Sequence, residues 1–130
     1  MVEGVVLDAS VVVELLTGSS HAPAVRARLA GHHLHAPAHL DAEVLSALGR
    51  LQRGGRLSTR AVTAALRRHA TLPVERHLLA ALLDGAWARR SNLRLADALY
   101  VELADTLGAP LLTTDAALAA ASQHAELIEP

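Results

Sequence analysis

Short apolar segments alternate along this chain with longer segments of helical periodicity, and this order restricts the possible folds more than any other feature. The runs at 5–7 and 110–113 are brief, largely aliphatic and bounded by polar residues. Such runs are typical of strands buried on both faces of a parallel sheet. Weaker strand signals lie at 34–36, 73–74 and 126–128. The alternation predicts an α/β fold with a five-stranded, mainly parallel sheet in a three-layer α/β/α arrangement.

Capping residues and glycines bound the helices that we expect between these strands. Ser10 and Ser58 are suited to cap helices, Pro23 suits a first helical turn, and Gly54 with Gly55 ends the longest amphipathic segment. We expect helices at about 10–16, 23–30, 38–53, 58–70, 78–90 and 95–107, with a short one after Asp115. The buried face of the 38–53 helix is expected to consist of Leu40, Val44, Leu45, Leu48 and Leu51.

Length and composition favour one folded domain that spans residues 1–130. Hydrophobic residues make up 52% of the chain and charged residues 19%, a balance typical of globular proteins and not of disordered ones. No apolar run approaches the roughly 18 residues of a membrane span, and the N-terminus lacks a signal-peptide pattern. We therefore expect a soluble, cytoplasmic protein.

Two residue types are missing, and their absence excludes several kinds of site. The chain has no cysteine, so a disulfide framework, a Cys-ligated zinc site and a thiol nucleophile are excluded. It also has no lysine, because all 12 basic residues are arginines. A phosphate-binding P-loop, a phospho-receiver domain and an aspartate phosphatase each need a lysine, and a G-x-S-x-G nucleophile motif is missing as well.

Four acidic residues occupy positions where a site is expected. Asp8 and Asp115 directly follow the two strongest strands, and ligands of open α/β sheets bind at the carboxyl ends of strands. Glu43 and Asp97 lie in the first turns of helices and have apolar neighbours. A carboxylate at the edge of a core needs a partner, and without lysine a metal ion is a suitable one. The pattern favours a metal site built from these carboxylates.

Each acid also has a structural interpretation. An acid after a strand often caps the next helix, and an acid in a first helical turn is stabilised by the helix dipole. For Asp8 or Asp115 alone the two interpretations are equally good, and their occurrence together on the two strongest strands favours function. Asp41 lies two residues before Glu43 and could share its role.

Three segments together resemble PIN-domain nucleases, and specifically the VapC toxins of bacterial VapBC toxin–antitoxin pairs. They are VVLDASVVVELL at 5–16, AEVLSAL at 42–48 and LADALYVELADTLGAPLLTTDAAL at 95–118, in the order in which the family has them. The resemblance implies the strand order 3-2-1-4-5 and an endoribonuclease toxin that inhibits growth and translation. It further implies a VapB-like antitoxin and a homodimer.

The resemblance also implies roles for individual residues. Asp8, Glu43, Asp97 and Asp115 match the four catalytic, metal-binding acids of the family, and Ser10 and Thr114 match its accessory hydroxyl positions. Before the third acid the family often has Ser or Thr as a helix cap, whereas this chain has Arg94. This difference questions where the helix starts, and it could bring an arginine to the rim of the site.

The expected chemistry follows from the charges. Four carboxylates within a few ångströms would raise one another's pKa unless cations neutralised them. All-oxygen ligation selects Mg²⁺ or Mn²⁺, one of which can activate water for attack on a phosphodiester while a second stabilises the leaving oxygen. A histidine-pair ribonuclease is the competing chemistry, because four histidines lie between 32 and 39. The spacing of these histidines matches no zinc-binding pattern. A turn and an irregular strand are expected to scatter these rings.

The region between Glu43 and Glu75 contains six arginines and no acid. It is a candidate phosphate-binding surface, and a solvated helix face explains it equally well. The candidate RNA-binding arginines are Arg50, Arg53, Arg56, Arg60 and Arg94. A PIN-like module that binds RNA or protein without cutting is the alternative to a nuclease, and it predicts no metal-dependent cleavage.

Overall fold

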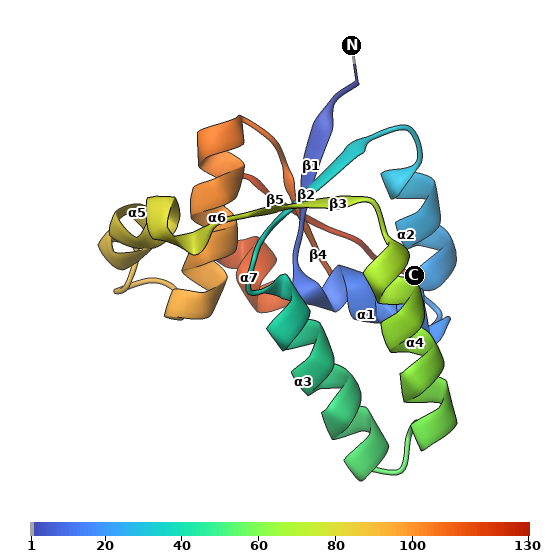
Figure 1. Ribbon diagram of the computed structural model, residues 1–130. Helices are drawn as coiled ribbons and strands as arrows, with labels where there is room; N and C mark the ends of the chain where they lie inside the picture. Colours follow the sequence, from blue (N-terminus) through green and yellow to red (C-terminus); the bar gives the residue numbers. More distant parts are fainter. Residues whose placement is uncertain (1) are drawn as a thin grey trace.

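A five-stranded parallel sheet forms the centre of the computed structural model, which describes residues 2–130 (Figure 1). The strands run in the order β3-β2-β1-β4-β5, and every neighbouring pair is parallel. Their bounds are β1 Gly4–Leu7, β2 His33–Pro37, β3 Val74–His77, β4 Leu111–Thr113 and β5 Ala125–Leu127. The expected α/β class, the five strands and the order 3-2-1-4-5 are confirmed.

The register of the two central strands explains why their acids meet. Val6 pairs with Leu111 and Leu7 with Leu112, so both strands end at the same edge of the sheet. The residues Val5, Val6, Leu111 and Leu112 are fully buried because helices cover both faces of the sheet at this point. The chain leaves β1 and β4 into Asp8 and Asp115, which therefore lie side by side along one edge.

Helices pack on both faces of the sheet. Helix α6 lies against β1 and β2 with α5 outside it, whereas α1 lies on the opposite face and contacts α2, α3 and α4 (Figure 1). The helical elements are α1 Ala9–Thr17, α2 Ala22–Leu29, α3 Leu40–Arg53, α4 Thr59–Thr71, the 3-10 turn η1 Leu79–Leu82, α5 Leu83–Ala88, α6 Leu95–Leu107 and α7 Ala116–Ala121.

Three local expectations are corrected by the structure. Helix α1 begins at Ala9 with Asp8 as its N-cap residue, and the Ser10 hydroxyl bonds to Asp8 and not to the helix backbone. The expected helix at 78–90 begins as the 3-10 turn η1 and continues as α5. Leu45 is 56% exposed because it lies about 100° around α3 from the buried Val44. The cap at Ser58 is confirmed, since its side chain accepts a hydrogen bond from the Ala61 N–H.

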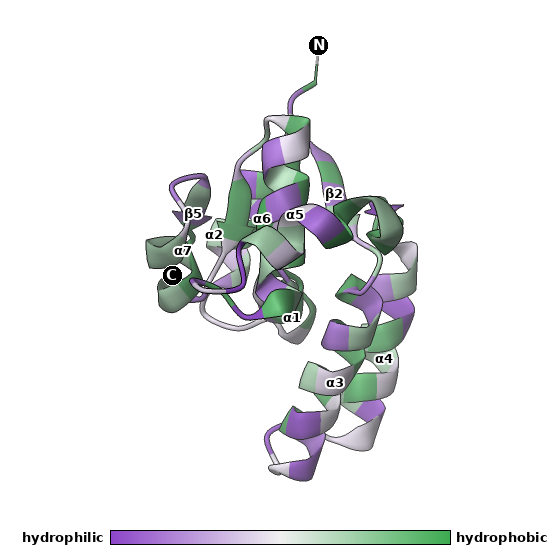
Figure 2. Ribbon diagram, turned by 90° about the vertical axis from the view of Figure 1, so that its left-hand side faces the viewer, coloured by the Kyte–Doolittle hydropathy of each residue, from purple (hydrophilic) through white to green (hydrophobic). Residues whose placement is uncertain are grey.

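Helices α3 and α4 form a hairpin that projects from the sheet, and hydrophobic and hydrophilic residues alternate along it (Figures 1 and 2). Its inner side joins the core through Leu40, Val44, Leu48 and Ala65. Among residues 2–130, no helix has the length and hydrophobicity to cross a membrane.

Candidate active site

A pocket of about 500 Å³ lies where β1 ends and α3 and α6 begin. It collects side chains from four separate stretches of the chain, and all four candidate acids are among them. Its polar lining residues are Asp8, Ser10, Glu14, Glu43, Arg50, Arg56, Arg94, Asp97 and Asp115. Sequence positions that are more than 100 residues apart thus meet in one concave site, as expected for the edge of an α/β sheet.

The Asp8 carboxylate is held by two hydroxyl groups. Its Oδ2 accepts hydrogen bonds from Ser10 Oγ at 2.7 Å and from Thr113 Oγ1 at 2.8 Å. Ser10 Oγ in turn accepts from the Thr114 N–H, and Thr113 Oγ1 accepts from the Asp115 N–H. These bonds tie the end of β1 to the end of β4. The second oxygen, Oδ1, has no hydrogen-bond partner within the described part of the chain.

Glu43 is fixed from the opposite side by a buried tyrosine. Tyr100 Oη donates to Glu43 Oε1 at 2.6 Å, and His39 Nε2 lies 3.6 Å from the same oxygen. The rings of His39 and Tyr100 pack with their centroids 4.7 Å apart. Burial and the neighbouring Glu43 raise the pKa of Tyr100 far above its usual range, so the hydroxyl remains a donor.

Asp97 and Asp115 have different partners. The Arg94 guanidinium donates to both oxygens of Asp97, at 3.0 and 3.3 Å. Asp115 caps α7, since its Oδ1 accepts from the N–H groups of Ala117 and Leu118. The capping interpretation of Asp115 is therefore correct for one of its oxygens, and the other has no hydrogen-bond partner among residues 2–130.

The charges in the pocket act on one another. The pKa of Asp8 is raised, first by burial and further by the negative charges of Asp97 and Glu43, although the two hydroxyl hydrogen bonds lower it. The pKa of Arg94 is raised by its hydrogen bond to Asp97 and by the charges of Glu43 and Asp115. The pocket thus places a buried carboxylate beside two other acids, with three arginines among its lining residues.

The four acids share a pocket but do not converge as closely as expected from the sequence. A group of three Asp, Glu or His ligand atoms within 4.8 Å of one another occurs once among residues 2–130, and it lies elsewhere, at His35, Glu75 and His77. Asp8, Glu43 and Asp97 are each held by a separate partner.

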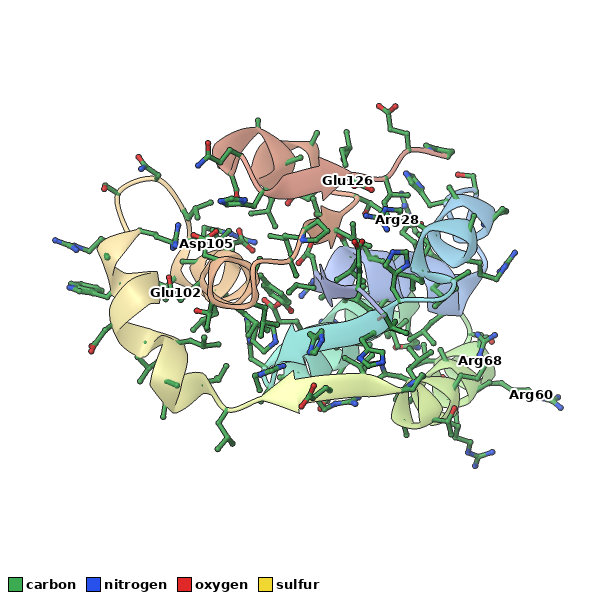
Figure 3. All side chains as sticks on the ribbon, turned by 90° about the horizontal axis from the view of Figure 1, so that it is seen from above. Arg28, Arg60, Arg68, Glu102, Asp105 and Glu126 are labelled. Carbon is green, nitrogen blue, oxygen red and sulfur yellow. The ribbon has the colours of Figure 1, made fainter. Side chains whose placement is uncertain are left out.

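The candidate arginines divide into two sets. Arg50, Arg56 and Arg94 line the pocket, whereas Arg53 and Arg60 do not. Figure 3 shows Arg60 extending away from α4 into solvent. Arg28, which is not one of the candidates, lies beside Glu126 and donates hydrogen bonds to it. The pocket arginines lie at the end of α3, in the loop that follows it and directly before α6.

Sequence reasoning missed three residues of the site and left one alternative open. Thr113, and not Thr114, supplies the hydroxyl that contacts Asp8; Thr114 contributes its backbone N–H to Ser10. Tyr100 donates a hydrogen bond to Glu43. His39 precedes Glu43 by one helical turn, a spacing that could have revealed it. Asp41 does not line the pocket.

Comparisons with known proteins identify the family of this chain. The model of the PIN domain family matches residues 5–123. Ribonuclease VapC3 of Mycobacterium tuberculosis is 60% identical over 126 residues, which cover 95% of this chain and 92% of that protein. Ribonuclease VapC12 of the same organism is 38% identical over 125 residues, with coverage of 96% and 97%.

Two solved structures share the fold. PAE2754 from Pyrobaculum aerophilum has a TM-score of 0.68 at 23% identity, covering 95% of this chain and 82% of that chain. Mycobacterium tuberculosis VapC20, described as a sarcin-ricin loop cleaving toxin, has a TM-score of 0.68 at 19% identity, with coverage of 92% and 95%. The family match includes all four acids of the pocket, and the relatives align over nearly the whole length, so this chain belongs to the PIN-domain family, among the VapC ribonucleases.

Proposed function

We propose that this chain is a Mg²⁺- or Mn²⁺-dependent endoribonuclease that hydrolyses RNA phosphodiesters and acts as the toxin of a toxin–antitoxin pair. The observation that carries the proposal is the pocket in which four carboxylates from distant parts of the chain meet arginines. The names of the relatives, Ribonuclease VapC3 and Ribonuclease VapC12, support RNA as the substrate.

The residues of the pocket fit a divalent cation of this class. Its donors are carboxylate and hydroxyl oxygens, which hard ions such as Mg²⁺ and Mn²⁺ prefer. The Asp8 carboxyl is buried near two other acids, and a bound cation would offset the burial and the neighbouring charges that raise its pKa. Asp8, Glu43, Asp97 and Asp115 would hold the cation, which when bound would stabilise the charge that develops on the phosphate.

The chain's own residues prepare the site before any substrate arrives. Ser10 and Thr113 fix one oxygen of Asp8, Tyr100 fixes one of Glu43, and the α7 backbone fixes one of Asp115. In each carboxylate the other oxygen is left for binding. Such fixed orientations reduce the reorganisation that binding would otherwise require. The Arg94 side chain is 79% exposed and can also bind a phosphate of the RNA backbone.

The antitoxin is proposed to cover the apolar faces of α2, α3 and α4, and the toxin to act as a homodimer. A groove of about 360 Å³ supports a partner surface on this side of the molecule. It lies between the end of α1 and the start of α4, and its lining includes Leu16, Leu57, Ala61 and Ala65.

Cleavage assays on the purified chain test the nuclease assignment. We expect RNA to be cut in Mg²⁺ and to remain intact in EDTA, and mapping of RNA 5′ ends after induced expression should show new ends with 5′-phosphates. Asp97→Asn should lower the cleavage rate by at least about 100-fold, since it removes a charged group of the site.

Asp105→Asn is the matched control, because Asp105 lies on the same helix and is bonded to Arg89 and His124 outside the pocket. It should cleave like the wild type. Cleavage that persists in EDTA would instead support a histidine-based ribonuclease. Identical 5′-end maps for the wild type and Asp97→Asn, together with RNA binding, would support the non-catalytic module.

A further inference from the structure

Three potential metal ligands meet near the β3 edge of the sheet. His35 on β2 and Glu75 and His77 on β3 each offer a ligand atom, and these atoms lie within 4.8 Å of one another. None of the three lines the acid pocket. The group is thus a second candidate site, made mainly of imidazole.

The register of the edge strands creates this group. His35 pairs with Glu75, and Pro37 pairs with His77 in the same parallel ladder. Side chains two residues apart on a strand point to the same face, so Glu75 and His77 both lie beside His35. Residues 33–37 form a regular strand, whereas the sequence was expected to give an irregular one that scatters the rings.

The distances suit a small tetrahedral ion. His35 Nδ1 lies 3.0 Å from His77 Nε2 and 3.1 Å from Glu75 Oε2. Bonds of 2.0–2.1 Å to a tetrahedral zinc ion place two ligand atoms about 3.3 Å apart. Both distances from His35 Nδ1 are therefore close to that spacing, and the ligand atoms of Glu75 and His77 lie within 4.8 Å of each other.

Two neighbours compete for one nitrogen of this group. A neutral imidazole carries one N–H, so His35 Nδ1 can donate to Glu75 or to His77 but not to both. The Glu75 side chain is 68% exposed, so an ion can reach the group from solvent.

Gly4 leaves room for the His35 ring against β1. A Cβ at position 4 would lie 3.0 Å from His35 Nε2, so a side chain there would push the ring aside by a few tenths of an ångström. With Nε2 against β1, the other nitrogen, Nδ1, faces the β3 residues. One ligand is thus positioned before an ion binds.

We propose that His35, Glu75 and His77 bind a transition-metal ion that prefers imidazole, with Zn²⁺ as its representative. Two imidazoles and one carboxylate form a ligand set that suits Zn²⁺ and other transition-metal ions, in contrast to the all-oxygen acid pocket. The ion links the edge strand β3 to β2 and stabilises that edge. The proposal does not depend on nuclease activity.

Calorimetric titration of the full chain with ZnCl₂, in saturating Mg²⁺ to occupy the acid pocket, tests the site. We expect one Zn²⁺ per chain and a thermal unfolding midpoint several degrees higher with excess Zn²⁺. Glu75→Gln and His77→Ala should each weaken Zn²⁺ binding by at least about 100-fold, since losing even a partner of a ligand costs 10–100-fold. Unfolding in EDTA verifies that both variants fold.

His124→Ala is the matched control, because it removes an exposed imidazole that is bonded to Asp105 far along the chain. It should bind Zn²⁺ like the wild type. Co²⁺ adds a spectroscopic measurement, since four-coordinate Co²⁺ absorbs visible light much more strongly than six-coordinate Co²⁺. Weak absorption would overturn the proposal. Zn²⁺ binding that is unchanged in His77→Ala and lost in Asp97→Asn would also overturn it and would assign the ion to the acid pocket.

Discussion

Asp8 is the residue in which stability and function conflict most directly. It is 7% exposed, and its carboxylate faces two other acids across the pocket. Ser10 and Thr113 compensate for part of the lost hydration with two hydrogen bonds, but the pKa remains raised. An acid whose pKa is raised by folding destabilises the fold once it ionises, so the folded state loses stability as the pH rises above the unfolded pKa of about 3.9.

We therefore predict that Asp8→Asn stabilises the metal-free protein. The amide keeps the size of the carboxyl group and its oxygen can still accept from Ser10 and Thr113, while the buried charge is removed. The unfolding midpoint in EDTA at pH 7 should rise by a few degrees, and RNA cleavage should be lost. Asp105→Asn, which breaks an ion pair, should not raise the midpoint. A lower midpoint for Asp8→Asn would show that the charge is already compensated.

At this scale the sequence predicted the acids better than their partners. Asp8 and Asp115 are recognisable because each ends a strong strand, and the resemblance to the family added Glu43 and Asp97. Thr113 and Thr114 are the same residue type in adjacent positions, so only the phase of the strand decides which hydroxyl faces Asp8. The bond from Tyr100 to Glu43 spans 57 residues and depends on how α3 and α6 pack.

Three elements are joined by a cluster that the sequence left ambiguous. Asp41 on α3 accepts hydrogen bonds from His69 on α4 at 2.7 Å and from Arg76 on β3 at 2.9 to 3.0 Å. The hydrogen bond from Arg76 is the main cause of a lowered pKa at Asp41. Asp41 thus joins the α3–α4 hairpin to the edge of the sheet, whereas Glu43 faces the pocket.

We predict that Asp41→Asn lowers stability and leaves cleavage unchanged. A carboxyl whose pKa is lowered by folding stabilises the fold above its unfolded pKa of about 3.9, and this contribution is lost as the pH falls through the folded pKa. The unfolding midpoint of Asp41→Asn should therefore lie below that of the wild type at pH 7 and approach it below about pH 4. Since Asp41 is half exposed, the difference should be small, about 1 kcal/mol or less.

Glu43→Gln is the matched variant, with the opposite expectation, namely loss of cleavage. If Asp41→Asn reduced cleavage as strongly as Glu43→Gln, the assignment of Glu43 as the fourth acid would be wrong. The measurements are thermal unfolding across pH and cleavage of one RNA at fixed Mg²⁺.

The sequence predicted the existence of the elements more reliably than their detail. Apolar runs identified β1 and β4 most clearly, because parallel strands buried on both faces have a distinctive composition. The edge strands β3 and β5 are partly exposed and gave weaker signals, and β3 spans Val74–His77 whereas it was expected at 73–74. The 3-10 winding of η1 was not predicted, because nothing in the pattern at 78–82 differs from a regular first turn. Gly85 has a role that appears only in the fold: any Cβ there would clash with Glu102 of α6.

Over the whole molecule, a net charge of −1 conceals a local separation of charge. The acid pocket has Arg50, Arg56 and Arg94 at its border, and Arg60 points into solvent from α4 (Figure 3). RNA is a chain of negative charges, so it can approach these acids only where arginines counter the repulsion. The arginines that line the pocket are therefore the expected contacts of the scissile region.

We predict that these arginines determine the salt dependence of RNA binding. Each phosphate contact with a single strand contributes about 0.7 to the slope of log affinity against log salt concentration. In an Asp97→Asn background, which should prevent cutting, Arg50→Ala and Arg56→Ala should each reduce the slope for an unstructured RNA by about 0.7. Arg60→Ala should leave it unchanged. If Arg60→Ala reduced the slope as much as Arg50→Ala does, the RNA would also contact α4 outside the pocket, and the prediction would be wrong.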